Sequence, residues 1–177
     1  MSKRFIPAVA VLVLLAASPV AAQTWTCTGV GSCAATQTAS LTIPSIVSLD
    51  LGAGTFTLTP PTPADLVTGN VLEATSPNIT VKANKAWTLS ISAAAANFTP
   101  PAGGARARSM LRWASAVGAW GTYAAVTGAG VQFANGAATN GANPAIYFGS
   151  EYINDFSDVS NVPGTYTLDL TFTLAAP

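Results

Sequence analysis

The sequence predicts an all-β fold, an immunoglobulin-like antiparallel β-sandwich of about seven to nine strands. First, apolar and polar residues alternate strictly through residues 165–174, which is the period of two of a half-buried strand. Second, the chain is rich in Thr and Val, which favour strands, and poor in helix-forming Glu, Lys and Gln. Third, residues that favour turns, namely Gly, Pro and Asn, separate the short apolar runs.

Residues 1–22 have the three parts of a secretory signal peptide. The positive start, the apolar stretch and the small-residue cleavage site are Lys3-Arg4, residues 5–17 and Val20-Ala21-Ala22. Cleavage is therefore expected before Gln23. Because Pro19 interrupts the apolar run before it reaches the roughly 20 residues of a membrane-spanning helix, we expect no stable membrane span after cleavage. The expected location is secreted, periplasmic or cell-surface.

The next segment, residues 23–40, contains both cysteines of the chain. Cys27 and Cys33 are separated by Thr-Gly-Val-Gly-Ser, and in an oxidising exported compartment this spacing predicts a small disulfide loop. A structural zinc site is the alternative, but two Cys without any His lack the four ligands it needs. The loop is expected to tie down the new N-terminus.

Residues 41–177 are expected to form a single β-sandwich domain. Leu41, Ile43, Val47, Leu49 and Leu51 share one parity, in a strand that Pro44 places at an edge or next to a bulge. Phe56 and Leu58 indicate a short second strand, which the proline-rich residues 60–63 end.

The clearest internal strands lie in residues 79–92. Ile79, Val81 and Ala83 alternate with polar residues, and Trp87, Leu89 and Ile91 continue the alternation. Residues 83–86 between the two runs predict a tight turn or a bulge with Asn84 at positive φ.

Weaker alternation predicts the remaining strands. They are residues 111–113, 120–126, 131–133 and 146–152, with loops over residues 97–104 and 135–144. Pro163-Gly164 predicts a turn before the terminal strand, residues 165–174.

Two stretches resemble those of bacterial exported β-sandwich surface proteins. The residues are Ile79-Thr-Val-Lys-Ala-Asn-Lys-Ala-Trp-Thr-Leu-Ser-Ile-Ser92 and Pro163-Gly-Thr-Tyr-Thr-Leu-Asp-Leu-Thr-Phe-Thr-Leu174. The group contains fimbrial subunits, spore coat protein U-like domains and WxL-like wall-binding domains. The resemblance implies a structural or adhesive role on a bacterial surface, with self-assembly or another envelope protein as partner. In the fimbrial proteins an N-terminal segment completes the sheet of the next subunit, and Thr38–Ile43 alternates suitably for this role.

The chain departs from the fimbrial pattern, because Cys27 and Cys33 are close neighbours, whereas fimbrial subunits usually bridge strands that are far apart in sequence. Trp87-Thr88-Leu89 has only the bare letters of the wall-binding motif.

Composition argues against most catalytic chemistry. The chain has no His, which removes the ordinary Ser-His-Asp site and any His-based metal centre. Acid–base work would fall to Asp and Glu, and a glycosidase would need two of them across a cleft; the mature candidates are Asp50, Asp65, Glu73, Glu151, Asp155, Asp158 and Asp169. Without clustered Lys and Arg, nucleic acid is not an expected partner. We expect no enzyme activity, no cofactor and no bound metal.

Two charged clusters have alternatives that stay open. Glu151, Asp155 and Asp158 are close enough in sequence to hold calcium, although the dedicated calcium-loop pattern is missing and a solvated turn explains them more simply. A second cluster, Arg106, Arg108 and Arg112, would suit an anionic polymer, but an exposed loop and strand edge is the simpler interpretation.

Aromatic residues offer an alternative function, the binding of a glycan or wall polymer. Sugars stack on exposed rings, and Trp113 and Trp120 have no clean strand register, which makes them the better candidates for an exposed platform. A place in the core remains the simpler interpretation of both rings. Trp87 shares parity with Leu89 and Ile91 and is therefore expected in the core.

Overall fold

The computed structural model describes residues 28–34 and 36–177, so the predicted signal peptide and Cys27 lie outside the described residues. The chain separates into two units, one ending at Thr42 and one spanning Ile43–Pro177. All described helices and strands belong to the second unit. Within the described ranges, no helix combines the length and the apolar character needed to cross a bilayer.

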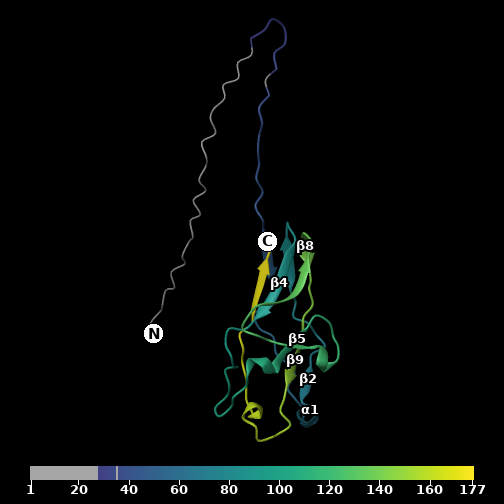
Figure 1. The fold of residues 1–177 in the computed structure, drawn as a ribbon, viewed down its shortest axis with the longest axis vertical. Coiled ribbons are helices and arrows are strands. Elements are labelled where there is room, and N and C mark those ends of the chain that lie inside the picture. The colour runs from purple at the N-terminus through teal and green to yellow at the C-terminus, as the bar shows by residue number, and fades with distance from the viewer. Residues whose placement is uncertain (1–27, 35) are drawn as a thin grey trace, which may run out of the picture. The chain divides into compact units, whose positions relative to one another are not determined.

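The second unit is almost entirely β-structure, which confirms the predicted fold class (Figure 1). The described residues contain ten strands: β1 (Val47–Asp50), β2 (Asn70–Leu72), β3 (Thr80–Ala83), β4 (Trp87–Ser92), β5 (Leu111–Ala114), β6 (Ala124–Ala125), β7 (Val131–Gly136), β8 (Thr139–Ala142), β9 (Tyr147–Glu151) and β10 (Thr171–Ala175). The helical elements are α1 (Pro63–Thr68) and three 3₁₀ turns, η1 (Arg108–Met110), η2 (Trp120–Thr122) and η3 (Val159–Asn161).

The strands pair antiparallel in three sheets, with the orders β1-β3-β8, β10-β4-β7 and β2-β9-β5-β6. The first two sheets continue into each other, because β3 leads into β4 and β7 leads into β8. Their pairing also continues almost in register, from Val81 opposite Ala142 to Trp87 opposite Gly136. They therefore form one curved layer, and the four-stranded sheet forms the other. β1 lies at an edge, as the nearby Pro44 predicted.

Asn84 fixes the bend between β3 and β4, but not in the predicted way. No non-glycine residue in the described ranges has positive φ, so the predicted left-handed Asn84 is wrong. Its side chain instead donates to the Pro44 carbonyl at 2.8 Å and accepts from the Ile46 amide at 2.8 Å. These side-chain bonds hold the incoming strand against the bend without a left-handed residue.

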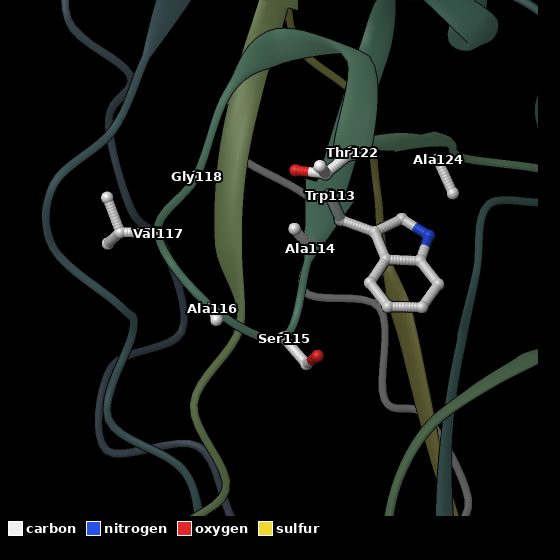
Figure 2. Close-up of a pocket in the computed structure, with 8 residues that line it drawn as sticks. All are labelled: Trp113, Ala114, Ser115, Ala116, Val117, Gly118, Thr122 and Ala124. Carbon is white, nitrogen blue, oxygen red and sulfur yellow. The ribbon is translucent and has the colours of Figure 1, made fainter.

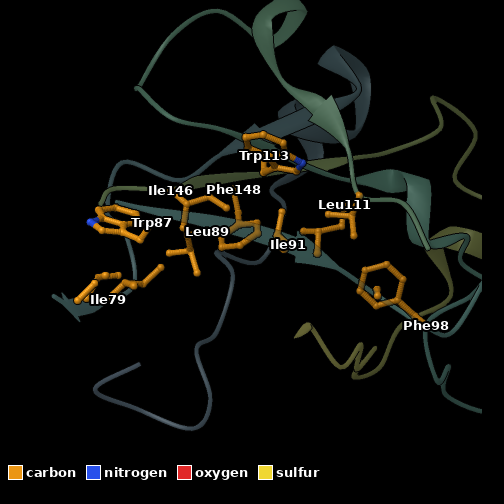
Figure 3. Packing of buried hydrophobic residues seen from close by; sticks show 13 residues of the cluster. Ile79, Trp87, Leu89, Ile91, Phe98, Leu111, Trp113, Ile146 and Phe148 are labelled. Carbon is orange, nitrogen blue, oxygen red and sulfur yellow. The ribbon is translucent and has the colours of Figure 1, made fainter. Parts of the chain in front are cut away.

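The core lies between the layers and comes from the predicted alternation (Figure 3). In β4 the residues Trp87, Leu89 and Ile91 are buried while the residues between them are half-buried. They meet side chains of the four-stranded sheet, among them Trp113 and Phe148. Burial of each such side chain contributes about 1.5–3 kcal/mol, so this cluster is the main source of stability.

Two large aromatic rings lie directly over glycines. Trp87 is the cross-strand partner of Gly136, and a Cβ added to Gly136 would lie 2.8 Å from the indole ring. A Cβ added to Gly149 would likewise lie 2.8 Å from the ring of Trp120, which belongs to η2 and not to a paired strand. At both positions the missing side chain lets the ring approach the backbone.

The second predicted strand, at Phe56 and Leu58, does not form, and a short helix, α1, follows these residues. Thr62 and Asp65 form a capping box, Pro63 opens the helix, and Gly69 ends it with φ 82°. The prolines that were expected to stop a strand therefore precede and start a helix.

Three other predicted boundaries are wrong. The loop predicted over residues 135–144 contains the end of β7 and all of β8, and the segment 120–126 has only the two strand residues of β6 after a 3₁₀ turn. The terminal strand begins at Thr171, because β4 ends opposite it at Ser92. Before that point, Thr167 pairs only with Thr99, in an isolated bridge.

The core assignment predicts that replacing two phenylalanines by alanine will have very different effects on the free energy of unfolding. Phe148 is 1% exposed, whereas Phe156 is 65% exposed. Phe148→Ala is expected to lower the free energy of unfolding by about 3–5 kcal/mol through lost burial and a residual cavity. Phe156→Ala, the matched control, should change it by less than about 0.5 kcal/mol. Chemical denaturation measures both, and equal losses would contradict this core.

Candidate functional site

One side of the sandwich carries a long, mainly apolar groove. The segment after β1, residues 51–61, contributes one part of its lining, and residues 160–172, which lead into β10, contribute another. The groove has a volume of about 790 Å³. Phe56 is anchored there by stacking on Phe148, with 4.8 Å between ring centroids. Prolines keep parts of both segments out of regular strand pairing, which leaves the groove open beside the core.

Arg106 lines this groove and is only 6% exposed. Its guanidinium donates to the Ser160 carbonyl at 3.3 Å and to the Glu151 carbonyl. Three rings surround it, with centroids 4.6 Å (Tyr152), 5.7 Å (Phe98) and 5.9 Å (Tyr166) from the guanidinium carbon. Burial lowers the pKa of Arg106, and the neighbouring tyrosines oppose that shift. An arginine nevertheless stays protonated, so the groove contains a buried positive charge.

The three arginines do not form the exposed cluster that the sequence suggested. Arg106 is buried, and Arg108 donates to successive carbonyls at Ala93, Ala94 and Ala95. Arg112 forms an ion pair with Glu151 at 2.8 Å. Each guanidinium is therefore committed to a different part of the fold, and an anionic-polymer patch does not result.

Trp113 lies in the core, as the simpler interpretation had it, and not on an exposed platform. The residue is 8% exposed and belongs to the core cluster, where its ring meets Phe133 edge-on at 5.9 Å between centroids. Trp113 borders a pocket of about 460 Å³, which the small side chains of residues 114–118 also line (Figure 2). This pocket has no charged residue in its lining.

Trp120 is half-buried, and its ring is already in contact with other groups. The guanidinium carbon of Arg112 lies 5.0 Å from the ring centroid, and Tyr123 stacks at 6.3 Å. Gly149 lies against the same ring. Trp113 and Trp120 therefore do not form a shared open platform, and the role of Trp120 in ligand binding stays a prediction.

The acidic residues Asp155 and Asp158 support turns, which is the simpler of the two interpretations of this cluster. Asp155 accepts from the amide and hydroxyl of Ser157 at 2.9 and 2.7 Å, and Asp158 accepts from the amide of Ser160 at 2.7 Å. Over the described ranges, Asp, Glu and Cys side chains nowhere gather in a group of three that could hold a metal ion. Glu151 is paired with Arg112, so the three carboxylates do not converge.

Two further acids have local structural roles. Glu73 accepts from the amide and hydroxyl of Thr59, at 2.6 and 2.9 Å, and so ties the groove wall to the end of β2. Asp65 caps α1. The disulfide between Cys27 and Cys33 stays a prediction, because Cys27 lies outside the described residues.

The outer edge of the curved layer is a second candidate for function. β7 and β8 are edge strands of six and four residues, and they follow each other along the same side of the layer. Neither contains a charged residue or a proline. Natural edge strands usually have such residues because free N–H and C=O groups otherwise pair with another chain.

Comparisons with protein families, with curated proteins and with solved structures found no match for this chain.

The turn at Asp155 predicts a local loosening in acid. Hydrogen bonds from the Ser157 hydroxyl and amide hold the pKa of Asp155 below its ordinary value of 3.8. A depressed pKa in the folded state adds stability above the unfolded value, and this stability is lost as the pH falls through the folded pKa. The protection factor of the Ser157 amide against hydrogen exchange, which corrects for the intrinsic pH dependence of exchange, should therefore fall as the pH drops below 3.8. Asp155→Asn keeps an acceptor but does not titrate, so this fall in protection should disappear; an unchanged profile would contradict the assignment.

Proposed function

We propose that the protein is a non-enzymatic structural component of a secreted or cell-surface assembly. In this assembly, an extended segment of one copy pairs with the open β7–β8 edge of the next. The observation that carries the proposal is this edge, which has free backbone groups on its outer side and no protecting charge or proline.

Strand addition suits this edge for a physical reason. Backbone hydrogen bonds supply affinity in such pairing, and alternate side chains supply specificity. β7 and β8 keep nearly one register against β4 and β3, with one register shift in each pairing. Their outer edges therefore offer a template in short straight stretches on both sides of these shifts. Part of β7 is already held on the inner side, where Phe133 contacts Trp113 and Phe172. A second copy would therefore pair with a strand whose inner side is already packed against the core.

The segment Thr38–Ile43 is the proposed donor. It lies outside any helix or strand, and its larger apolar side chains, Leu41 and Ile43, are exposed. Six extended residues span roughly 20 Å, which matches the six residues of β7. Alternating side chains would place Leu41 and Ile43 on one face of the added strand.

Five of the seven acidic side chains considered for acid–base work have local structural roles. Asp65, Glu73, Asp155 and Asp158 hold caps and turns, while Glu151 is in an ion pair. Glycan binding, the alternative function, has no specific support from the ring geometry, because Trp113 is in the core and Trp120 already stacks with Arg112 and Tyr123.

The edge proposal predicts loss of assembly when the edge is charged. Asn135 and Asn140 are exposed residues of β7 and β8. The double variant Asn135→Lys/Asn140→Lys should weaken self-association about tenfold or more, because lysines on an edge strand oppose pairing with another strand. Sedimentation velocity and electron microscopy of the purified protein measure the effect. Ala64→Lys, on the exposed surface of α1, is the control with added charge elsewhere.

Deletion of residues 23–43 tests the donor separately. It should abolish assembly while the sandwich stays soluble and folded. Filaments or oligomers that persist in both the deletion and the edge variant would refute strand addition, and a purely monomeric native protein would refute it as well.

A further inference from the structure

The groove combines an apolar lining with a single buried charge. Its apolar residues include Phe56, Leu58, Ile79, Leu168 and Phe172. The charged residues in its lining are Arg106, which is buried, and Asp169, which is exposed. A volume of about 790 Å³ is within the range of sites that enclose small organic ligands.

Arg106 retains unused hydrogen-bonding capacity. A guanidinium has five N–H donors, and Arg106 uses two of them on the carbonyls of Ser160 and Glu151. Its aromatic neighbours interact with the cation through their rings, and the side-chain hydrogen bonds of Arg106 go to these two carbonyls. Throughout residues 28–34 and 36–177, the ion pair within 4 Å is Arg112–Glu151. The Glu151 carboxylate also acts on Arg106 electrostatically, but it forms no ion pair with Arg106.

This combination favours an anionic group on an apolar body. A guanidinium binds a carboxylate through parallel N–H···O bonds, and burial strengthens the attraction. An alkyl chain has no polar groups to satisfy, so it can lie along the leucine and phenylalanine side chains without further partners. A cationic or neutral head group would bring no negative charge to Arg106, whose carboxylate neighbour Glu151 is already paired with Arg112.

We propose that the groove binds a long-chain aliphatic carboxylate, with the carboxylate on Arg106 and the alkyl chain against Phe56, Leu168 and Phe172. This inference goes beyond the proposed function and does not depend on strand addition at the β7–β8 edge.

The first experiment compares three ligands that have the same alkyl chain and differ only in their head group. Dodecanoate, dodecanol and dodecyltrimethylammonium are titrated below their aggregation concentrations into the purified protein, and binding is followed by calorimetry. Dodecanoate should bind about tenfold or more tightly than either of the others, with one molecule per chain. Equal binding of dodecanoate and dodecanol, or no binding of dodecanoate, would overturn the proposal without any variant.

Arg106→Met then tests the residue, with folding checked by thermal denaturation. This variant should bind dodecanoate and dodecanol equally, because the methionine keeps apolar bulk and removes the charge. Lys82→Met removes an exposed charge from β3 and should keep the preference for dodecanoate. If Arg106→Met does not fold, Leu168→Asp offers a second test, because a carboxylate in the lining should repel dodecanoate and lower its affinity about tenfold.

A synthetic peptide with the sequence of residues 36–43 distinguishes a different occupant. If this peptide binds and dodecanoate does not, the groove accepts extended chain, and the carboxylate proposal is refuted.

Discussion

The fold depends on the burial of one side of a single bent run of chain, residues 79–92. Its odd-numbered apolar side chains enter the core on both sides of the bend, whereas Lys85 in the bend is exposed. Its backbone pairs with β1 and β10 on one side and with β8 and β7 on the other. A shift by one residue would place this entire apolar set in water. The register of four strands therefore follows from the packing of one. Asn84 adds a local constraint, because it fixes the direction in which the run turns.

Local alternation was sufficient to predict β3 and β4 and to predict which side of β10 faces the core, because each strand has one apolar side and one polar side. It could not show that β3 and β4 belong to different sheets, since that depends on partners about 50 residues away in sequence. β8 was missed because Thr139–Ala142 has small and polar residues with little apolar contrast. α1 was missed because its six residues are too few for a helical period, although the capping box Thr62–Asp65 was present in the sequence.

The candidate site was harder to predict, because burial outside regular strands has no periodic signal. Trp113 could have been placed in the core from Leu111, two residues earlier on the same strand face, which is also buried. Arg106 offered no such clue, since it lies in a loop between small residues and its partners come from Glu151 and Ser160. The same holds for the edge position of β7 and β8, which only the complete pairing order defines.

The contact between Trp87 and Gly136 restricts how this protein can diverge. Any side chain at position 136 would occupy the space of the indole ring, so a larger residue there requires a smaller one at position 87. Position 136 is therefore free to enlarge only together with a smaller side chain at position 87. The chain has few distinctive sequence motifs. In an alignment of distant relatives, a larger residue at position 136 together with a smaller one at position 87 would therefore indicate homology more sensitively than overall sequence identity.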